Sequence, residues 1–521
     1  MLIDACARLA VLGRIFNRAA AATNAVCIGR RPNPGTVGPD LGPCLKTRDD
    51  FRFQFPARTK VRPYTAREIV ANVSEVLNRG IKPLLQSGAL RFIWRCQISG
   101  LSVAAAVGLA APPPNVILIN CDDLGYGDLA CYGAKDIRTP HLDRMAKEGT
   151  RFTDFSVTSP LCTPSRAALM TGKYPGLVGL ATGVLRPDAQ KGLAGEEITL
   201  AEVMKPRGYT TGCIGKWHLG FLKGMRPMDQ GFDIYYGVLH NLDRFETVVF
   251  EQTGGMPVLR GDSVERRPAV PAEMTALYTT EALKFIETNR ARPFFLYLGH
   301  AMPHIPFDAS PRFKGKSGRG LYGDAVEELD DSTGQILEKL RALGLAANTL
   351  VLFTSDNGPE RNTPGSAAPL RGTKHTVFEG GLRVPFIAWW PGRVPAARVC
   401  DEFLSTLDVL PTLAQLAGAS IPPGRQLDGF DVSAVLFGLA SARSRRTTLY
   451  SLYGLKANRR ESFRDGPWKL HHSATPELYN LADDPAESNN VAARHPDMVQ
   501  RLAELTRQTR EATHAFPAIL P

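Results

Sequence analysis

The chain has 521 residues, of which 44% are hydrophobic and 22% charged, so it is long enough for a large core divided between two domains. Its net charge of +11 is unevenly distributed: residues 1–96 contain 16 basic and six acidic residues, whereas the other 425 contain 46 and 45. The body of the chain is therefore nearly neutral. This distribution argues against a nucleic-acid partner, which would need a basic stripe on the folded domain.

The first 111 residues are predicted to be a leader. An apolar run at residues 98–111 follows Arg91 and Arg95, which is typical of a secretory signal peptide at residues 91–111. The run is too short for a stable transmembrane anchor. We therefore expect an exported protein (periplasmic, extracellular or lysosome-like) whose mature chain starts near Ala111. A small buried helix and an Arg-rich organelle-targeting extension are the alternatives.

The cysteines are compatible with an exported protein but do not indicate a particular set of disulfide bonds. The nine cysteines contain no CxxC pair and no zinc-binding spacing with histidine. They are too sparse for a disulfide scaffold, although an exported protein could form one or two bridges.

The body begins with a continuous apolar run, Asn115–Cys121, which is typical of a strand buried on both faces of a sheet. Apolar periodicity then predicts helices at residues 141–148, 165–171, 199–205, 275–289 and 325–343. Further strands are expected at residues 152–157, 209–214, 294–298, 349–354 and 384–390. This alternation predicts an α/β fold with a mainly parallel sheet covered by helices.

The pattern changes near residue 440. Short strand candidates at residues 449–452, 468–471 and 477–480 precede a helix at residues 497–513. We therefore expect a catalytic domain at residues 112–439 and a smaller α+β domain at residues 440–521.

Charged or imidazole-bearing residues follow four of the predicted strands. In parallel sheets, ligands bind beyond the carboxyl ends of the strands. The four clusters therefore predict one active site. They are Asp122 with Asp123, Lys216 with His218, His300 with His304, and Asp356 with Asn357.

Two of these clusters offer only oxygen ligands. Asp122, Asp123, Asp356 and Asn357 together suit a hard divalent cation such as Ca²⁺ or Mg²⁺. The alternative is a pair of Asx-rich turns that cap strands.

Cys162 lies directly before a predicted helix, in the stretch SPLCTPSRAALMTG at residues 159–172. The amides of that helix would face Cys162 and any bound anion. A buried core cysteine and a thiolate nucleophile are both compatible with this position.

Residues 162–166 (CTPSR) match C-x-P-S-R, and the chain thereby resembles the sulfatase family, in which this cysteine is oxidised to formylglycine. The resemblance extends over about residues 113–510 and is greatest to arylsulfatase A-like enzymes. It implies an alkaline-phosphatase-like fold. Its further blocks are DDLGYGDL at 122–129, GKWHLG at 215–220, TSDNG at 354–358, KHTVFEGG at 374–381 and ELYNL at 477–481.

The resemblance also implies roles for single residues. Asp122, Asp123, Asp356 and Asn357 would hold Ca²⁺, with Mg²⁺ as the alternative and the modified Cys162 completing the shell. Arg166 would steady the nucleophile, and Lys216 and Lys374 would hold the sulfate oxygens. His304 or Lys374 would protonate the departing alcohol, and His218 would remove a proton from the second hydroxyl of the hydrated aldehyde.

The same resemblance implies partners. These are a formylglycine-generating enzyme during maturation and a sulfated small molecule, glycan or lipid as substrate.

Two segments depart from the family pattern. Residues 238–243 (VLHNLD) lack the serine that the family often places there, and either His240 replaces its contact or the contact is absent. The segment after Tyr174-Pro175 lacks the arginine that is usual in the family. Both departures affect substrate identity rather than the reaction. A phosphate or phosphonate ester hydrolase and a non-enzymatic sulfatase-like binding protein are the competing functions.

Overall fold

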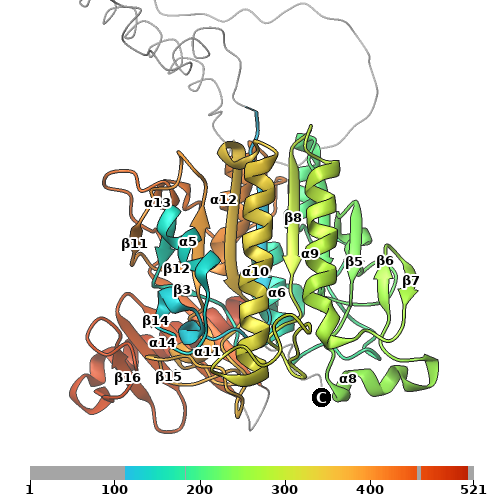
Figure 1. Ribbon diagram of the computed structural model, residues 1–521. Helices are drawn as coiled ribbons and strands as arrows, with labels where there is room; N and C mark the ends of the chain where they lie inside the picture. Colours follow the sequence, from blue (N-terminus) through green and yellow to red (C-terminus); the bar gives the residue numbers. More distant parts are fainter. Residues whose placement is uncertain (1–111, 182, 455–458, 514–521) are drawn as a thin grey trace, which may run out of the picture. The chain divides into compact units, whose positions relative to one another are not determined.

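The computed structural model describes residues 112–181, 183–454 and 459–513 (Figure 1). The predicted signal peptide and the rest of the leader lie outside these residues. Within them, no helix is both long and apolar enough to cross a membrane. The cysteines of the described part, Cys121, Cys131, Cys162, Cys213 and Cys400, are all free thiols.

A ten-stranded mixed sheet forms the centre of the fold, in the order β11-β2-β10-β9-β1-β8-β4-β5-β6-β7. Its middle strands, from β9 to β5, are parallel. The mainly parallel α/β sheet is thus confirmed. The strands are β1 (Asn115–Cys121), β2 (Thr150–Phe152), β4 (Thr210–Gly215), β5 (Ile234–Gly237), β6 (Val258–Arg260), β7 (Ser263–Arg266), β8 (Phe294–Gly299), β9 (Thr349–Ser355), β10 (Phe386–Trp389) and β11 (Arg398–Cys400).

Helices cover both faces because the central strands are apolar on both sides. In β1, Val116 and Leu118 pack into one core, whereas Ile117 and Ile119 pack into the other. The first core contains α6 (Cys162–Thr171), α7 (Leu200–Met204), α12 (Val409–Ala417) and α13 (Ser433–Leu436). The second contains α5 (Pro140–Glu148), α9 (Pro271–Thr288) and α10 (Gly320–Ala342), and the last two lie side by side in Figure 1.

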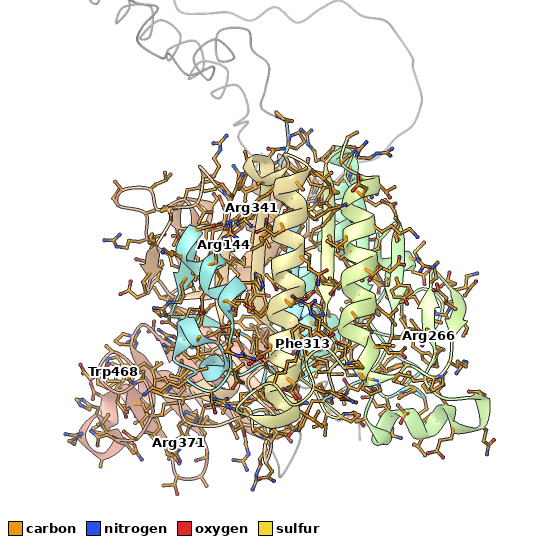
Figure 2. The ribbon with its side chains drawn as sticks, in the orientation of Figure 1. Arg144, Arg266, Phe313, Arg341, Arg371 and Trp468 are labelled. Atoms are coloured by element: carbon orange, nitrogen blue, oxygen red, sulfur yellow. The ribbon has the colours of Figure 1, made fainter. Side chains whose placement is uncertain are left out.

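An exposed arginine and a half-buried one link helices of the second face. Arg144 of α5 and Arg341 of α10 both pair with Glu148, and Figure 2 shows the two arginines close to each other. Exposed ion pairs of this kind contribute little to stability, so the apolar core holds these helices.

A smaller antiparallel sheet follows in the C-terminal part, with the strand order β13-β14-β15-β16. Its predicted α+β composition is confirmed, although β14 was not predicted. The sheet packs against α14 (Pro496–Ala512) through a small apolar core. Its strands are β13 (Thr448–Tyr453), β14 (Arg460–Asp465), β15 (Trp468–His472) and β16 (Glu477–Asn480). The bounds 112–439 and 440–521 for the two domains stay a prediction.

One expectation about local structure was wrong. The single strand predicted at residues 152–157 is divided between β2 and β3 (Phe155–Ser156), and β3 pairs with β12 (Leu404–Ser405) in a separate sheet. The strand expected at residues 384–390 is confirmed as β10, and it runs antiparallel to β9. Hydrophobic periodicity reports burial but not strand direction. The remaining short helices are α8 (Arg244–Thr247) and α11 (Glu379–Leu382).

Candidate active site

The four predicted oxygen-bearing residues meet beyond the carboxyl ends of β1 and β9. These strands are parallel neighbours, with Cys121 opposite Ser355. The Asp123 amide donates to Asp356 Oδ1 at 3.2 Å, and Asn357 Nδ2 donates to Asp123 Oδ1 at 2.7 Å. Asp122, Asp123, Asp356 and Asn357 are all buried.

Two lysines bring positive charge to the aspartate pair. Lys216 follows β4, and its Nζ donates to Asp122 Oδ2 at 2.6 Å. Lys374 lies in the loop after β9, where its Nζ donates to Asp123 Oδ2 at 2.7 Å. Burial raises the pKa of Asp122, but Lys216 and other cationic neighbours outweigh it and hold the pKa at about 2. Asp122 is therefore an anion at neutral pH.

A glycine allows Lys216 to reach this position. Gly215 ends β4 with a φ of 108°, in the region that favours glycine. A Cβ atom there would lie 1.9 Å from the carbonyl oxygen of Gly299 in the neighbouring strand. The close approach lets the Lys216 amide donate to that same oxygen at 2.7 Å.

Helix α6 places Cys162 and Arg166 one turn apart on the same face. The helix begins at Cys162, three residues earlier than predicted, because Pro164 lies in the first turn, where its missing N–H costs nothing. Cys162 Sγ lies 3.4 Å from Asp122 Oδ1. Arg166 Nε donates to Asp356 Oδ2 at 2.8 Å, and the whole arginine side chain is buried.

The two predicted catalytic histidines occupy different surroundings. His304 follows β8, and its Nε2 lies 3.6 Å from Asp123 Oδ2. Its Nδ1 donates to the carbonyl of Ile305 at 2.6 Å. His218 is completely buried, and burial lowers its pKa. Its nearest carboxylate is Glu246, at 3.5 Å.

Three of the seven non-glycine residues with positive φ in the described part of the chain lie in or beside this site. Asp123, His218 and His375 have φ values of 63°, 61° and 69°, in the left-handed region that non-glycine residues rarely adopt. Such conformations typically cost about 1–3 kcal/mol each and persist where the surrounding structure holds them. The strain therefore marks backbone that is held in place around the charged cluster.

A cavity of about 390 Å³ leads to these residues. His304 and Lys374 lie in its wall, and the C-terminal sheet contributes Tyr453. Its remaining lining is Leu161, Gly183, Val184, Asn241, Asp243, Glu246, Ile305, Glu360, His375 and Gly454.

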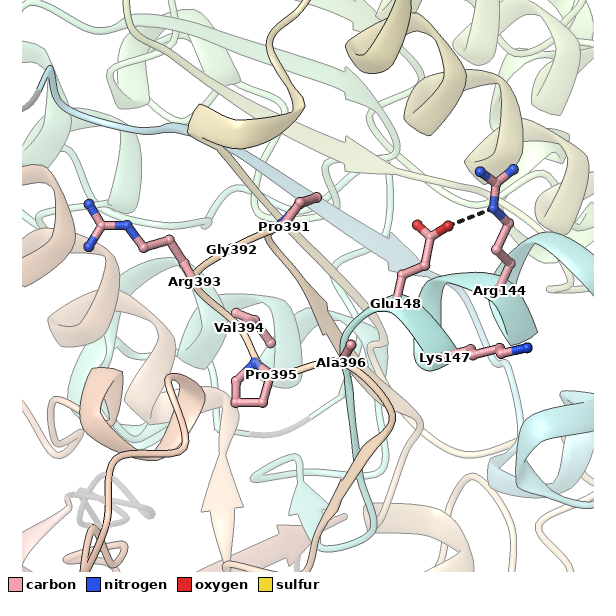
Figure 3. A pocket seen from close by; sticks show the side chains of 9 residues that line it. All are labelled: Arg144, Lys147, Glu148, Pro391, Gly392, Arg393, Val394, Pro395 and Ala396. Atoms are coloured by element: carbon pink, nitrogen blue, oxygen red, sulfur yellow. Dashed lines mark hydrogen bonds and ion pairs between the residues drawn. The ribbon is translucent and has the colours of Figure 1, made fainter. Parts of the chain in front are cut away.

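The larger cavity in Figure 3, of about 870 Å³, is not part of the site. Arg144, Lys147 and Glu148 of α5 and residues 391–396 after β10 line it. Because β10 is antiparallel to β9, its end lies at the opposite edge of the sheet from the strand ends described above. Figure 3 shows one ion pair there, between Arg144 and Glu148.

Three further residues contact the predicted site residues and carry no motif in the sequence. Glu360 pairs with Lys374 at 3.0 Å, Tyr297 accepts from Arg166 Nη1 at 3.0 Å, and Glu246 lies beside His218. Glu360 is four residues after Asp356, which was the available signal. His300 lies 3.4 Å from Ser332 and is a structural neighbour.

The oxygen cluster fits a hard cation. Asn357 Nδ2 donates to Asp123 Oδ1 and to the carbonyl of Gly358, whereas its buried Oδ1 has no hydrogen-bond partner among the described residues. A buried acceptor without a donor normally costs about 1–3 kcal/mol, and a cation would satisfy it. Three carboxylates and an amide oxygen form a donor set of the kind that Ca²⁺ prefers.

A buried cluster of oxygen ligands that suits a cation lies beside basic residues and a solvent-connected cavity at the carboxyl edge of the sheet, an arrangement suited to the hydrolysis of oxyanion esters. The chain belongs to the sulfatase family: residues 114–419 match the sequence model of that family. Residues 373–514 match the C-terminal region of N-sulphoglucosamine sulphohydrolase. It is therefore a sulfuric ester hydrolase.

Individual relatives support this assignment over most of the chain. Human arylsulfatase A is 40% identical over 78% of this chain and 89% of its own length. The dog N-acetylgalactosamine-6-sulfatase is 37% identical over 78% of this chain and 88% of its own. The crystal structure of Ps i-CgsB in complex with k-i-k-neocarrahexaose has a TM-score of 0.70 at 30% identity, covering 77% of this chain and 93% of that one.

Proposed function

We propose that this protein hydrolyses sulfate monoesters through a formylglycine made from Cys162, with a bound Ca²⁺ ion, and releases sulfate and an alcohol or phenol. The main support is the position of Cys162 in the first turn of α6, with its sulfur 3.4 Å from the oxygen cluster. Burial raises the pKa of the Cys162 thiol well above its usual value, and Lys216 and Lys374 only partly oppose this. An unmodified thiol here would be a poor nucleophile.

The proposed metal ligands are Asp122, Asp123, Asp356 and Asn357, together with the modified residue 162, and Mg²⁺ is the alternative ion. When bound, the ion would supply Lewis-acid stabilisation of charge on the sulfate oxygens. Three carboxylates are otherwise balanced by Arg166, Lys216 and Lys374. A divalent ion makes the site net positive, which suits an anionic ester.

Each basic residue has a task that its contacts support. Hydrated formylglycine offers one hydroxyl to attack sulfur and a second whose deprotonation expels sulfate. Arg166 steadies this residue from the same helical face, and Lys216 and Lys374 bind the sulfate oxygens. His304 protonates the departing oxygen, with Lys374 as the alternative acid, and His218 accepts the proton of the second hydroxyl.

The substrate class follows from the relatives and from the cavity. Aryl, glycan and lipid sulfates are the candidate substrates, and Tyr453 offers a flat apolar face in the cavity wall. We further propose export of the protein and its maturation by a formylglycine-generating enzyme.

Turnover of nitrophenyl sulfate against nitrophenyl phosphate tests the reaction class. Because residues 114–419 match the sulfatase family, nitrophenyl sulfate is expected to be the better substrate. A clear preference for nitrophenyl phosphate would contradict the proposal and indicate a phosphate ester hydrolase. If the protein hydrolyses neither compound, and no member of a panel of glycan sulfates, it would instead be a sulfatase-like binding protein.

Removal of the metal is expected to abolish activity, and added Ca²⁺ is expected to restore it, because the ion would supply the Lewis-acid stabilisation of charge on the sulfate oxygens and the net positive charge that suits an anionic ester. Asp356→Asn should lower the bound Ca²⁺ measured by elemental analysis. Asp262→Asn, at an exposed position, is the matched control. Full activity in protein shown to be metal-free would contradict the metal assignment.

His304→Ala is expected to slow hydrolysis of a sugar sulfate far more than that of nitrophenyl sulfate. A sugar alkoxide is a strong base that needs a proton to leave, and general acid catalysis contributes about 10²–10⁴-fold. Nitrophenolate leaves without this help. The ratio of kcat/KM for the two substrates measures the effect, and equal slowing of both would make Lys374 the acid.

A further inference from the structure

Glu246 is a buried carboxylate beside His218 that the family motifs do not include. His218 Nε2 lies 3.5 Å from Glu246 Oε1 and 3.1 Å from the carbonyl oxygen of Leu185. Both neighbours are acceptors at neutral pH, so Nε2 must carry the hydrogen. His218 Nδ1 is then unprotonated, and it has no hydrogen-bond partner among the described residues.

Glu246 is itself held firmly in place. The backbone amide of Asn241 donates to one of its oxygens at 2.8 Å, and the Asn241 side-chain amide donates to the other at 2.8 Å. Burial raises the pKa of Glu246, but His218, His240 and Lys216 outweigh it and lower the pKa to about 2. The carboxylate is therefore ionised and fixed in direction.

We infer that Glu246 is a positioning residue: together with the Leu185 carbonyl, its carboxylate holds His218 in the Nε2–H form, and its charge stabilises the imidazolium that forms when Nδ1 accepts a proton. This inference rests on the proposed function, in which His218 takes the proton of the second hydroxyl. The proton moves from that hydroxyl to Nδ1, and the C=O bond forms as the bond to sulfate breaks. The cation so formed on His218 faces the anion of Glu246. The proton later returns to solvent.

A metal ion is the competing occupant of the same cluster. Ligand atoms of His218, His240 and Glu246 all lie within 4.8 Å of one another. A metal-bound Nε2 of His218 would carry no hydrogen, yet that nitrogen faces the carbonyl of Leu185. The contacts therefore favour a proton on Nε2, and an experiment that locates this hydrogen decides between the two.

The position of the hydrogen on the His218 imidazole can be measured in protein that does not turn over substrate. Protein carrying Cys162→Ala, labelled with ¹⁵N-histidine and supplied with Ca²⁺, should show for His218 a protonated Nε2 and an unprotonated Nδ1. The signals are assigned by their loss in a second sample that also carries His218→Gln. A hydrogen on Nδ1, or none on either nitrogen, would overturn the inference.

Kinetics of Glu246→Gln test the role itself. We expect kcat to fall about 10- to 100-fold, as part of the roughly 10²–10⁴-fold that a general base contributes. KM should fall with kcat and kcat/KM should change little, because the base acts only after the leaving group has departed. The slowed step is the same for nitrophenyl and sugar sulfates, so the kcat values of the variant for the two substrates should converge. Rapid mixing with nitrophenyl sulfate should still release about one nitrophenol per active site before the slow phase. Glu251→Gln, at an exposed position nearby, is the matched control and should behave as wild type.

The outcomes separate this inference from the proposed function. Normal kcat in Glu246→Gln, or a loss of kcat/KM as large as the loss of kcat, would overturn the positioning role while wild-type sulfatase activity stood. Absence of any wild-type sulfate ester turnover would overturn the proposed function instead. Should Glu246→Gln fail to fold, Glu246→Asp, which keeps the negative charge, takes its place in the kinetics, and a hydrogen on Nδ1 in the ¹⁵N measurement would still overturn the inference.

Discussion

Cys162→Ala is expected to lower kcat for nitrophenyl sulfate by on the order of 10⁶, the scale seen when a covalent nucleophile is removed. Its position at the start of α6, with its sulfur 3.4 Å from Asp122 Oδ1, is consistent with the proposed role as the nucleophile. Cys131→Ala is the matched control, because Cys131 is a free, partly exposed thiol that makes no contact with the oxygen cluster.

Mass spectrometry of the same region tests the modification independently of activity. The tryptic peptide that contains Cys162 should have the mass of an aldehyde in place of the thiol. Fully active protein in which residue 162 is entirely a thiol would contradict the proposal, because burial raises the pKa of that thiol and keeps it protonated.

The largest expected effect on stability follows from Arg166→Met. Arg166 is completely buried, with Nη2 at 2.8 Å from Asp356 Oδ2 and 3.6 Å from Asp122 Oδ1. Removing one partner of a buried ion pair leaves an uncompensated charge and typically costs about 3–5 kcal/mol of unfolding free energy. Urea denaturation at a fixed Ca²⁺ concentration measures the loss.

An exposed arginine provides the control for this measurement. Arg144 pairs with Glu148 and Glu338 on the surface, and its side chain is 48% exposed. Arg144→Met should therefore cost less than about 1 kcal/mol. An Arg166→Met protein as stable as this control would mean that other groups balance the charge of Asp356.

The C-terminal sheet is joined to the rest of the chain by buried charge. Lys469 of β15 pairs with Glu379 at 2.8 Å, and Arg464 of β14 pairs with Asp154 at 2.6 Å. These contacts position β13, which ends at Tyr453 in the wall of the active-site cavity. The smaller sheet thus takes part in shaping the entrance to the site.

The sequence by itself determined the parts of this protein that depend on local pattern. Apolar runs such as Asn115–Cys121 identify buried strands, and the polar residues after them identify the edge where the site lies. Candidate roles could be given to the motif residues, among them Asp122, Lys216 and Asp356, because their motifs match those of a family whose members catalyse one type of reaction.

Only the tertiary structure decided what depends on strand direction and on long-range contact. The antiparallel direction of β10 could not be predicted from its apolar residues, because the hydrophobic pattern of a buried strand is the same for either strand direction. Glu246 lies 28 residues after His218 in the chain and reaches it only because the His218 amide donates to Leu239, which brings the following loop over the imidazole. Such contacts are set by the path of the folded chain, so no local spacing could have predicted them.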